Sequence, residues 1–241
     1  MRLHSIFEQG YETIVFFDCE TTGFDSVEAG DQIIELAAVT LSKNGEERQM
    51  DEFVSLTGKF ELSGLPQKII DLTGITNDQL FKEGKPIDSV FSEFIGLFNG
   101  KTLLVAYNAQ FDLIFVAKHL IDARGEKPEW LRSFNRADYL DPYSIYKDRH
   151  ISFKSHKLKD AIDYYNLGDK VKNTHRAIDD AIALREVTVA LNAENDDIPF
   201  YVNRFGWTKQ PPKQKLKKVS YYDLTQWHNL PNLRLYQRET L

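Results

Sequence analysis

The stretch Ile14-Val-Phe-Phe-Asp18-Cys-Glu20 is a short run of strand-forming apolar residues that ends in two carboxylates. Such a run is typical of a buried central strand. Because side chains two positions apart on a strand share a face, Asp18 and Glu20 should lie side by side, with Cys19 in the core on the other face. Two adjacent carboxylates repel each other, and a divalent cation with oxygen ligands removes that repulsion. Taken alone, however, the pair is better explained by a solvated strand end.

The sequence around this stretch predicts an α/β fold. Residues 32–41 and 50–56 predict two more strands, separated by the turn signal Lys43-Asn-Gly45, so the first three strands should form an antiparallel meander. Residues 57–85 predict irregular chain with short helices. Helices and strands then alternate, at 86–100 (helix), 102–106 (strand), 110–124 (helix), 135–143 (strand), 157–165 (helix) and 177–191 (helix). This order indicates a mixed five-stranded sheet flanked by helices.

Two further groups of polar residues follow at the ends of predicted elements. Asp112 falls in the first turn of a helix that follows a strand, where an acid is favourable near the helix N-terminus and where a metal ligand is the alternative. His175 and Asp180 are five positions apart, which on one helix separates them by about 140°. If His175 precedes the helix and Asp180 lies on its second turn, both reach one site. The imidazole is then suited to act as a general base.

Three segments together resemble the exonuclease motifs of the DnaQ-like, or DEDDh, 3′→5′ exonucleases, a family that includes the proofreading epsilon subunit of bacterial DNA polymerase III. The segments are Phe17-Asp-Cys-Glu-Thr-Thr-Gly23, Tyr107-Asn-Ala-Gln-Phe-Asp112 and His175-Arg-Ala-Ile-Asp-Asp-Ala181. Each motif alone is modest, but their order and spacing match over roughly residues 12 to 192.

The resemblance implies a ribonuclease-H-like fold and hydrolysis of 3′-terminal phosphodiester bonds that releases 5′-mononucleotides. It assigns two divalent cations, Mg²⁺ or Mn²⁺, to four acids: Asp18, Glu20, Asp112 (through water) and Asp180. It assigns the general base to His175. It also assigns contact with the terminal nucleotide, by backbone contact and by wedging or stacking, to Thr21, Thr22 and Phe24.

Charge is distributed unevenly along the chain. The net charge of -6 divides into -12 for residues 1–199 and +6 for residues 200–241. Divalent cations let an acidic body bind a polyanion. The sequence therefore predicts an exonuclease domain at 1–195 and a basic, aromatic C-terminal extension at 196–241. The extension either binds phosphates or is a solvated linker.

Three functions remain open at this stage. The first is a 3′→5′ exonuclease acting on single-stranded or frayed DNA ends, with a DNA polymerase as a possible partner, and the second is an exoribonuclease of the same family. The third is a non-catalytic subunit that binds nucleic acid or a polymerase through Lys213 to Lys218 and the aromatic residues Trp207, Tyr221, Tyr222 and Trp227.

The compartment is predicted from two features. The single cysteine, Cys19, excludes an internal disulfide and fits a reducing compartment. The apolar run at 14–17 is too short for a signal peptide or a membrane span. We therefore expect a cytoplasmic protein without a membrane partner.

Overall fold

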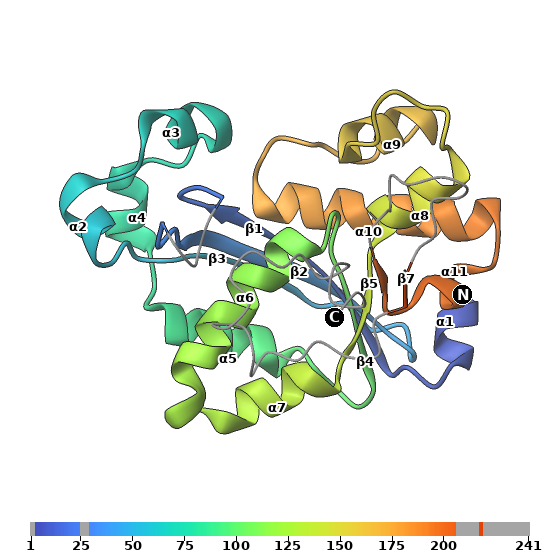
Figure 1. The fold of residues 1–241 in the computed structure, drawn as a ribbon, viewed down its shortest axis with the longest axis horizontal. Helices are drawn as coiled ribbons and strands as arrows, with labels where there is room; N and C mark the ends of the chain where they lie inside the picture. Colours follow the sequence, from blue (N-terminus) through green and yellow to red (C-terminus); the bar gives the residue numbers. More distant parts are fainter. Residues whose placement is uncertain (1–2, 25–28, 206–216, 219–241) are drawn as a thin grey trace.

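The computed structural model of the protein describes residues 3–24, 29–205 and 217–218. A five-stranded sheet forms its centre (Figure 1), and in spatial order the strands are β3 (Gln49–Phe53), β2 (Ile33–Ser42), β1 (Thr13–Thr21), β4 (Thr102–Val105) and β5 (Asp138–Leu140). β1 pairs antiparallel with β2, and β2 with β3, whereas β4 is parallel to both β1 and β5. The predicted meander and mixed sheet are therefore confirmed.

Two helical layers cover the sheet, and alternation along β1 supplies apolar residues to both (Figure 1). Val15 and Phe17 pack into the core on the face that is covered by α5 (Ile87–Gly96), α6 (Gln110–Asp122) and α7 (Pro128–Arg136). Ile14 and Phe16 pack into the core on the opposite face, under α8 (Pro142–Arg149), α9 (Leu158–Tyr164) and α10 (Ala177–Glu194). Burial of each of these side chains contributes about 1.5–3 kcal/mol to the free energy of unfolding. β1 therefore forms the centre of both cores.

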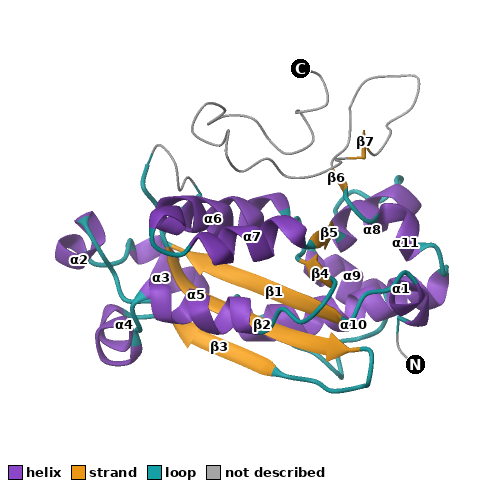
Figure 2. Ribbon diagram, turned by 90° about the horizontal axis from the view of Figure 1, so that it is seen from below, coloured by secondary structure: helices purple, strands orange, loops and turns teal. Residues whose placement is uncertain are grey.

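The segment after β3 forms a small lobe beside the end of β1, and Figure 2 shows this lobe at the opposite end of the molecule from α1 (His4–Glu8). It contains α2 (Lys59–Ser63), α3 (Gln67–Thr73) and α4 (Asn77–Glu83). Thr76 caps α4 by accepting a hydrogen bond from the Gln79 amide at 3.2 Å. Ile34 of β2 packs with Ile75 and Leu80, which attaches the lobe to the sheet. The predicted short helices in 57–85 are confirmed.

The predicted helices correspond to α5, α6, α9 and α10, but α1, α7, α8 and α11 (Ile198–Tyr201) were not predicted. The sequence signals for α7 and α8 were present. Pro128 and Pro142 occupy the first position of each helix, where proline needs no amide partner. Asp141 also caps α8 by accepting from the Tyr143 amide at 3.1 Å.

The packed chain continues past residue 195, the predicted end of the exonuclease domain. Ile198 and Tyr201 of α11 are buried in the core beneath α10, and the Tyr201 hydroxyl donates to Asp148 at 2.9 Å. Asn203 bonds to β5, where its amide donates to the Tyr139 carbonyl at 2.7 Å and its side-chain oxygen accepts from the Tyr139 amide at 2.9 Å. The division at 195 stays a prediction.

Beyond Asn203, β6 (Arg204–Phe205) pairs antiparallel with β7 (Lys217–Lys218). The tail residues Lys213, Trp207, Tyr221, Tyr222 and Trp227 lie outside the described residues. Among the helices that are described, none combines the length and the apolar character that crossing a membrane requires.

Candidate active site

The two acids of β1 lie on the sheet face that α10 covers. Cys19 is buried with Val15 and Phe17 on the other face, as predicted. Asp18 and Glu20 are half-buried. A register shift between Glu20 and Thr21 ends the regular pairing of β1 with β2, so the acids lie where the central strand leaves the sheet.

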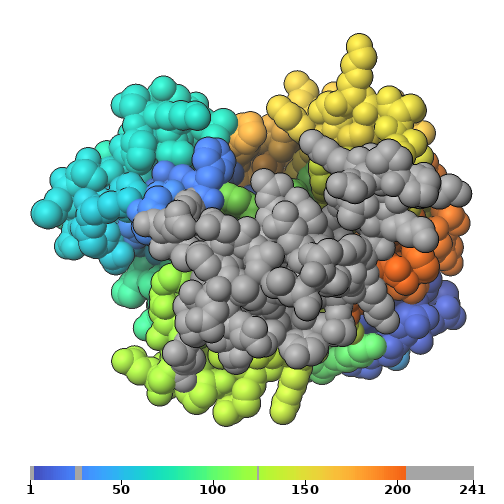
Figure 3. Space-filling view, viewed as in Figure 1, coloured from blue at the N-terminus to red at the C-terminus, as the bar shows by residue number. Residues whose placement is uncertain are grey.

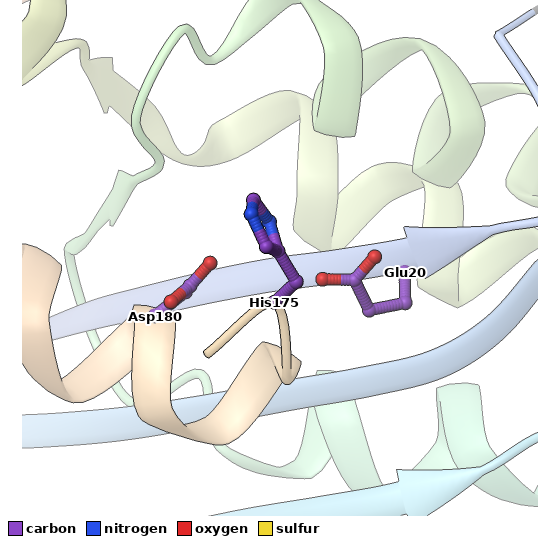
Figure 4. A group of neighbouring side chains, drawn as sticks. All are labelled: Glu20, His175 and Asp180. Atoms are coloured by element: carbon purple, nitrogen blue, oxygen red, sulfur yellow. The ribbon is translucent and has the colours of Figure 1, made fainter. Parts of the chain in front are cut away.

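The loop before α10 brings a histidine to this strand end. His175 is exposed and adopts a left-handed backbone conformation with φ 55°, and Arg176 is the N-cap of α10. Asp180 is buried near the start of the helix. Glu20, His175 and Asp180 each place one ligand atom within 4.8 Å of the others (Figure 4). The predicted position of His175 before the helix is therefore confirmed, whereas Asp180 lies in the first turn of α10 and not in the predicted second turn.

The fourth acid of the motifs reaches β1 from the opposite helical layer. Asp112 lies in the first turn of α6 and is 2% exposed. Its Oδ1 accepts a hydrogen bond from the Cys19 amide at 3.0 Å. Of the four predicted acids, neither Asp112 nor Asp18 is a member of the 4.8 Å cluster. Asp112 therefore anchors α6 to the strand segment between Asp18 and Glu20.

The acids at this site disfavour one another's charged forms. Burial, followed by the charges of Asp112 and Asp180, raises the pKa of Asp18 well above its ordinary value. Burial and the charge of Asp180 raise the pKa of Glu20 to about 9. Burial raises the pKa of Asp112 to about 8 and that of Asp180 to about 6. Without bound cations, the site therefore holds protons at neutral pH that free carboxyl groups would release.

This set of donors fits a divalent cation. Carboxylate oxygens are the ligands that Mg²⁺ and Mn²⁺ prefer, and the carboxylates of Glu20 and Asp180 already converge. The mutual repulsion that raises the pKa values is also what a cation relieves. The residues present therefore fit a divalent cation.

Cation binding should stabilise the protein more at pH 8 than at pH 6. Glu20, Asp112 and Asp180 have folded pKa values above the roughly 4 of free carboxyl groups. The folded state therefore binds more protons than the unfolded state, and stability without cations falls as pH rises from about 4 towards about 9. A cation removes that penalty. At a concentration about a hundred times its Kd at pH 8, Mg²⁺ should raise Tm by about 5–10 °C at pH 8, and the same concentration should raise Tm less at pH 6, measured by differential scanning fluorimetry. Equal shifts at both pH values would contradict this prediction.

The chain that follows Glu20 turns tightly. The Thr21 hydroxyl donates to the Gly23 carbonyl at 2.6 Å, and the Thr22 hydroxyl accepts from the Gln32 amide at 3.0 Å. Both threonines are buried, so their hydroxyls are used within the turn. A Cβ on Gly23 would lie 2.2 Å from a carboxylate oxygen of Asp31, so any other residue there would force the Asp31 side chain to move.

Phe24, in contrast, is 75% exposed. Its ring lies edge-on to the ring of Phe111, with 6.2 Å between centroids, and the Lys68 ammonium lies 6.0 Å from its centroid. Of the three residues predicted to contact substrate, Phe24 is thus the one whose side chain is presented to solvent.

Two residues near the site were missed from sequence. Glu35 is fully buried and pairs with Arg176, and the signal that could have revealed it was an acid inside the apolar run at 32–41. Beside Asp180, Asp179 accepts a hydrogen bond from the Thr174 hydroxyl at 2.6 Å.

The mixed sheet, with acids at the end of its central strand and at the start of α10, is the arrangement that the resemblance to exonucleases implies. The family of exonucleases named RNase_T matches residues 15–188, and the chain belongs to this family. The predicted membership of the DnaQ-like group of exonucleases is confirmed.

Relatives in sequence are DNA polymerases of the PolC type. The chain is 38% identical over 175 residues to the DNA polymerase III PolC-type of Clostridium perfringens, which covers 72% of this chain and 11% of that protein. It is 34% identical over 190 residues to that of Bacillus subtilis, covering 75% of this chain and 11% of that protein. The chain thus spans about a tenth of the length of these relatives.

Solved structures share the fold at lower identity. The nuclease domain of 3′hExo, a DEDDh family member bound to rAMP, superposes with a TM-score of 0.61 at 19% identity, covering 78% of this chain and 95% of that one. E. coli exonuclease I in complex with a dA16 oligonucleotide gives a TM-score of 0.63 at 15% identity, and the match covers 79% of this chain and 42% of that one. The predicted ribonuclease-H-like fold is confirmed.

Proposed function

We propose that this chain is a metal-dependent 3′→5′ exonuclease that hydrolyses the 3′-terminal phosphodiester bonds of DNA, at single-stranded or frayed ends, and releases 5′-mononucleotides. The observation that carries the proposal is the convergence of Glu20, His175 and Asp180 within 4.8 Å at the end of β1. Membership of an exonuclease family supports the reaction class. The PolC-type relatives favour DNA over RNA as the substrate.

In this mechanism the acids hold the cations and the histidine moves the proton. Asp18, Glu20 and Asp180 would hold two divalent cations, Mg²⁺ or Mn²⁺, with Asp112 assisting through water. Bound cations supply positive charge to the attacking and leaving oxygens of an in-line displacement. His175, exposed beside these acids, accepts the proton of the attacking water as general base.

The terminal nucleotide lies against the turn after β1 in this proposal. Thr21 and Thr22 contribute backbone contacts, because their side chains are buried in the turn. Phe24 stacks on or wedges beside the terminal base, with Phe111 behind it. Figure 3 shows a hollow between the lobe of α2–α4 (cyan) and the region of α9 (yellow), with the segment that leads into α10 between them. This hollow is the proposed entry for the 3′ end.

The same relatives are the basis for proposing a partner and a compartment. The PolC-type matches favour work beside a DNA polymerase in the cytoplasm. Within the chain, residues 1–195 would carry the exonuclease activity, and the basic extension at 196–241 would bind the polymerase or the phosphates of the strand.

Degradation of a 5′-labelled single-stranded DNA oligomer tests the function directly. With Mg²⁺ or Mn²⁺ we expect a ladder that shortens from the 3′ end, and with chelator no cleavage, because the acids alone cannot neutralise the phosphate. An RNA oligomer of the same sequence should be cleaved more slowly. Faster cleavage of the RNA would make the chain an exoribonuclease. If neither polymer were cleaved with either metal, a non-catalytic binding role would replace the proposal.

A further inference from the structure

A fifth acid lies directly beside the proposed cation site. In the register of β1 and β2, Glu35 is the cross-strand partner of Glu20, and its exposed fraction is 0%. Like charges opposite each other on neighbouring strands are destabilising. A buried carboxylate is also costly unless it is paired and fully hydrogen-bonded. Glu35 therefore needs a counter-charge at this position.

Arg176 supplies that counter-charge with a two-pronged contact. Its Nη2 donates to Oε1 of Glu35 at 2.6 Å, and its Nε donates to Oε1 at 3.0 Å and to Oε2 at 3.2 Å. The Ala177 amide donates to Oε2 at 2.9 Å. The guanidinium also lies 5.0 Å from the centroid of the Phe53 ring. Both oxygens of Glu35 are thus occupied, which leaves neither of them as a ligand for a cation.

The position of Arg176 in the chain links this pair to the site. Arg176 is the N-cap of α10 and directly follows His175, whose left-handed backbone points the imidazole towards Glu20 and Asp180. The Arg176 carbonyl accepts from the Asp180 amide at 3.0 Å. Fixing Arg176 and Ala177 to β2 therefore fixes the residue before the helix and the first turn after it.

We propose that Glu35 and Arg176 are positioning residues that hold the N-terminus of α10 on β2, so that Asp180 faces Glu20 at the distance needed for cation binding and His175 lies beside both as the general base. This inference rests on the proposed function, since it concerns the same site. Small displacements of reacting groups cost large factors in rate. Loss of a residue that orients a metal ligand typically costs about 10–100-fold in activity or metal affinity.

The other end of α10 offers a matched control. There Arg149 of α8 donates to the Leu191 carbonyl at 2.6 Å, to Glu194 at 3.1 Å and to the Asn195 carbonyl at 3.0 Å, and it also pairs with Asp197. Arg149→Ala removes about as many hydrogen bonds from the same helix as Arg176→Ala does. The two variants differ in which end of α10 they release.

The experiment compares Glu35→Gln, Glu35→Ala, Arg176→Ala and Arg149→Ala in the full chain, below the thermal transition of each. Single-turnover degradation of DNA gives the rate, and electron paramagnetic resonance titration of Mn²⁺ gives the affinity without requiring catalysis. We expect Glu35→Ala and Arg176→Ala to lose about 10–100-fold in rate and a comparable factor in Mn²⁺ affinity. Arg149→Ala should lower Tm and leave both quantities near wild type.

Two results would overturn the proposal. One is wild-type rate and Mn²⁺ affinity in Glu35→Ala and Arg176→Ala, and the other is an equal loss in Arg149→Ala. Glu35→Gln keeps the shape of the side chain but removes its charge. If Glu35→Ala does not fold, the rate and Mn²⁺ affinity of Glu35→Gln are compared with those of the wild type instead. If the wild type cleaves neither DNA nor RNA, the proposed function fails, while the Mn²⁺ affinities still decide whether Glu35 and Arg176 position the site.

Discussion

Asp18→Asn is expected to abolish nucleotide release, with a fall in rate of about 10³-fold or more, because cation charge stabilises the transition state by several kcal/mol. Asn keeps the size of the side chain and removes its charge. The change also removes one of the mutually repelling acids: burial and the charges of Asp112 and Asp180 raise the pKa of Asp18. The metal-free variant should therefore unfold at a Tm equal to or above that of the wild type at pH 8.

Single-turnover degradation of a 5′-labelled DNA oligomer measures the rate, and scanning fluorimetry with and without Mg²⁺ measures the thermal shift. Asp78→Asn is a matched control, since Asp78 is an exposed acid on α4 whose contact is an ion pair with Lys82. That variant should keep the wild-type rate and thermal shift. Retained activity in Asp18→Asn would remove Asp18 from the proposed set of cation ligands.

His175→Gly is expected to lower the rate by about 10²–10⁴-fold, the usual contribution of a general base. Glycine adopts the φ of 55° at this position without the steric cost that Ala would add, so the turn before α10 should persist. The exposed position of the imidazole leaves space that a small molecule can reach. Added imidazole should therefore restore part of the lost rate.

The rescue distinguishes a proton acceptor from a structural residue. Imidazole titrated into His175→Gly should raise the rate in a saturable manner, and it should have no effect on Asp18→Asn, which lacks a cation ligand instead. The wild-type Mn²⁺ affinity should be largely retained in His175→Gly. Loss of Mn²⁺ affinity together with failure of the rescue would identify His175 as a cation ligand rather than the base.

Much of the fold and the site followed from local patterns. The apolar run at 14–17 predicted β1, and the two-residue period placed Asp18 and Glu20 together on the face opposite Cys19. The five-residue spacing of His175 and Asp180 could be reconciled only with a loop before the helix, which the structure contains. Patterns of this kind depend on neighbours within a few residues, so they can be recognised directly in the sequence.

The contacts that could not be predicted from the sequence join residues that are far apart in the chain. Glu35 and Arg176 are 141 positions apart, and nothing near either residue indicates that the two meet. The Asp112 side chain bonds to a backbone amide 93 positions away, which sequence spacing alone does not reveal. α8 was missed for a different reason: its buried residues include Pro142 and Ser144, so it lacks a clear apolar stripe.

The contacts of Asn203 with β5 have a consequence for how molecules of this protein meet one another. β5 is the last strand of the sheet, and its outer side would offer unpaired amide and carbonyl groups as a template for another chain. Asn203 occupies that side at Tyr139, and its side-chain amide donates to Asp138 at 2.7 Å. A version of the protein shortened to residue 195 would leave this edge of β5 uncovered. A strand of a second molecule could then pair with β5, and the protein would self-associate. A version that ends after residue 205 would keep it closed.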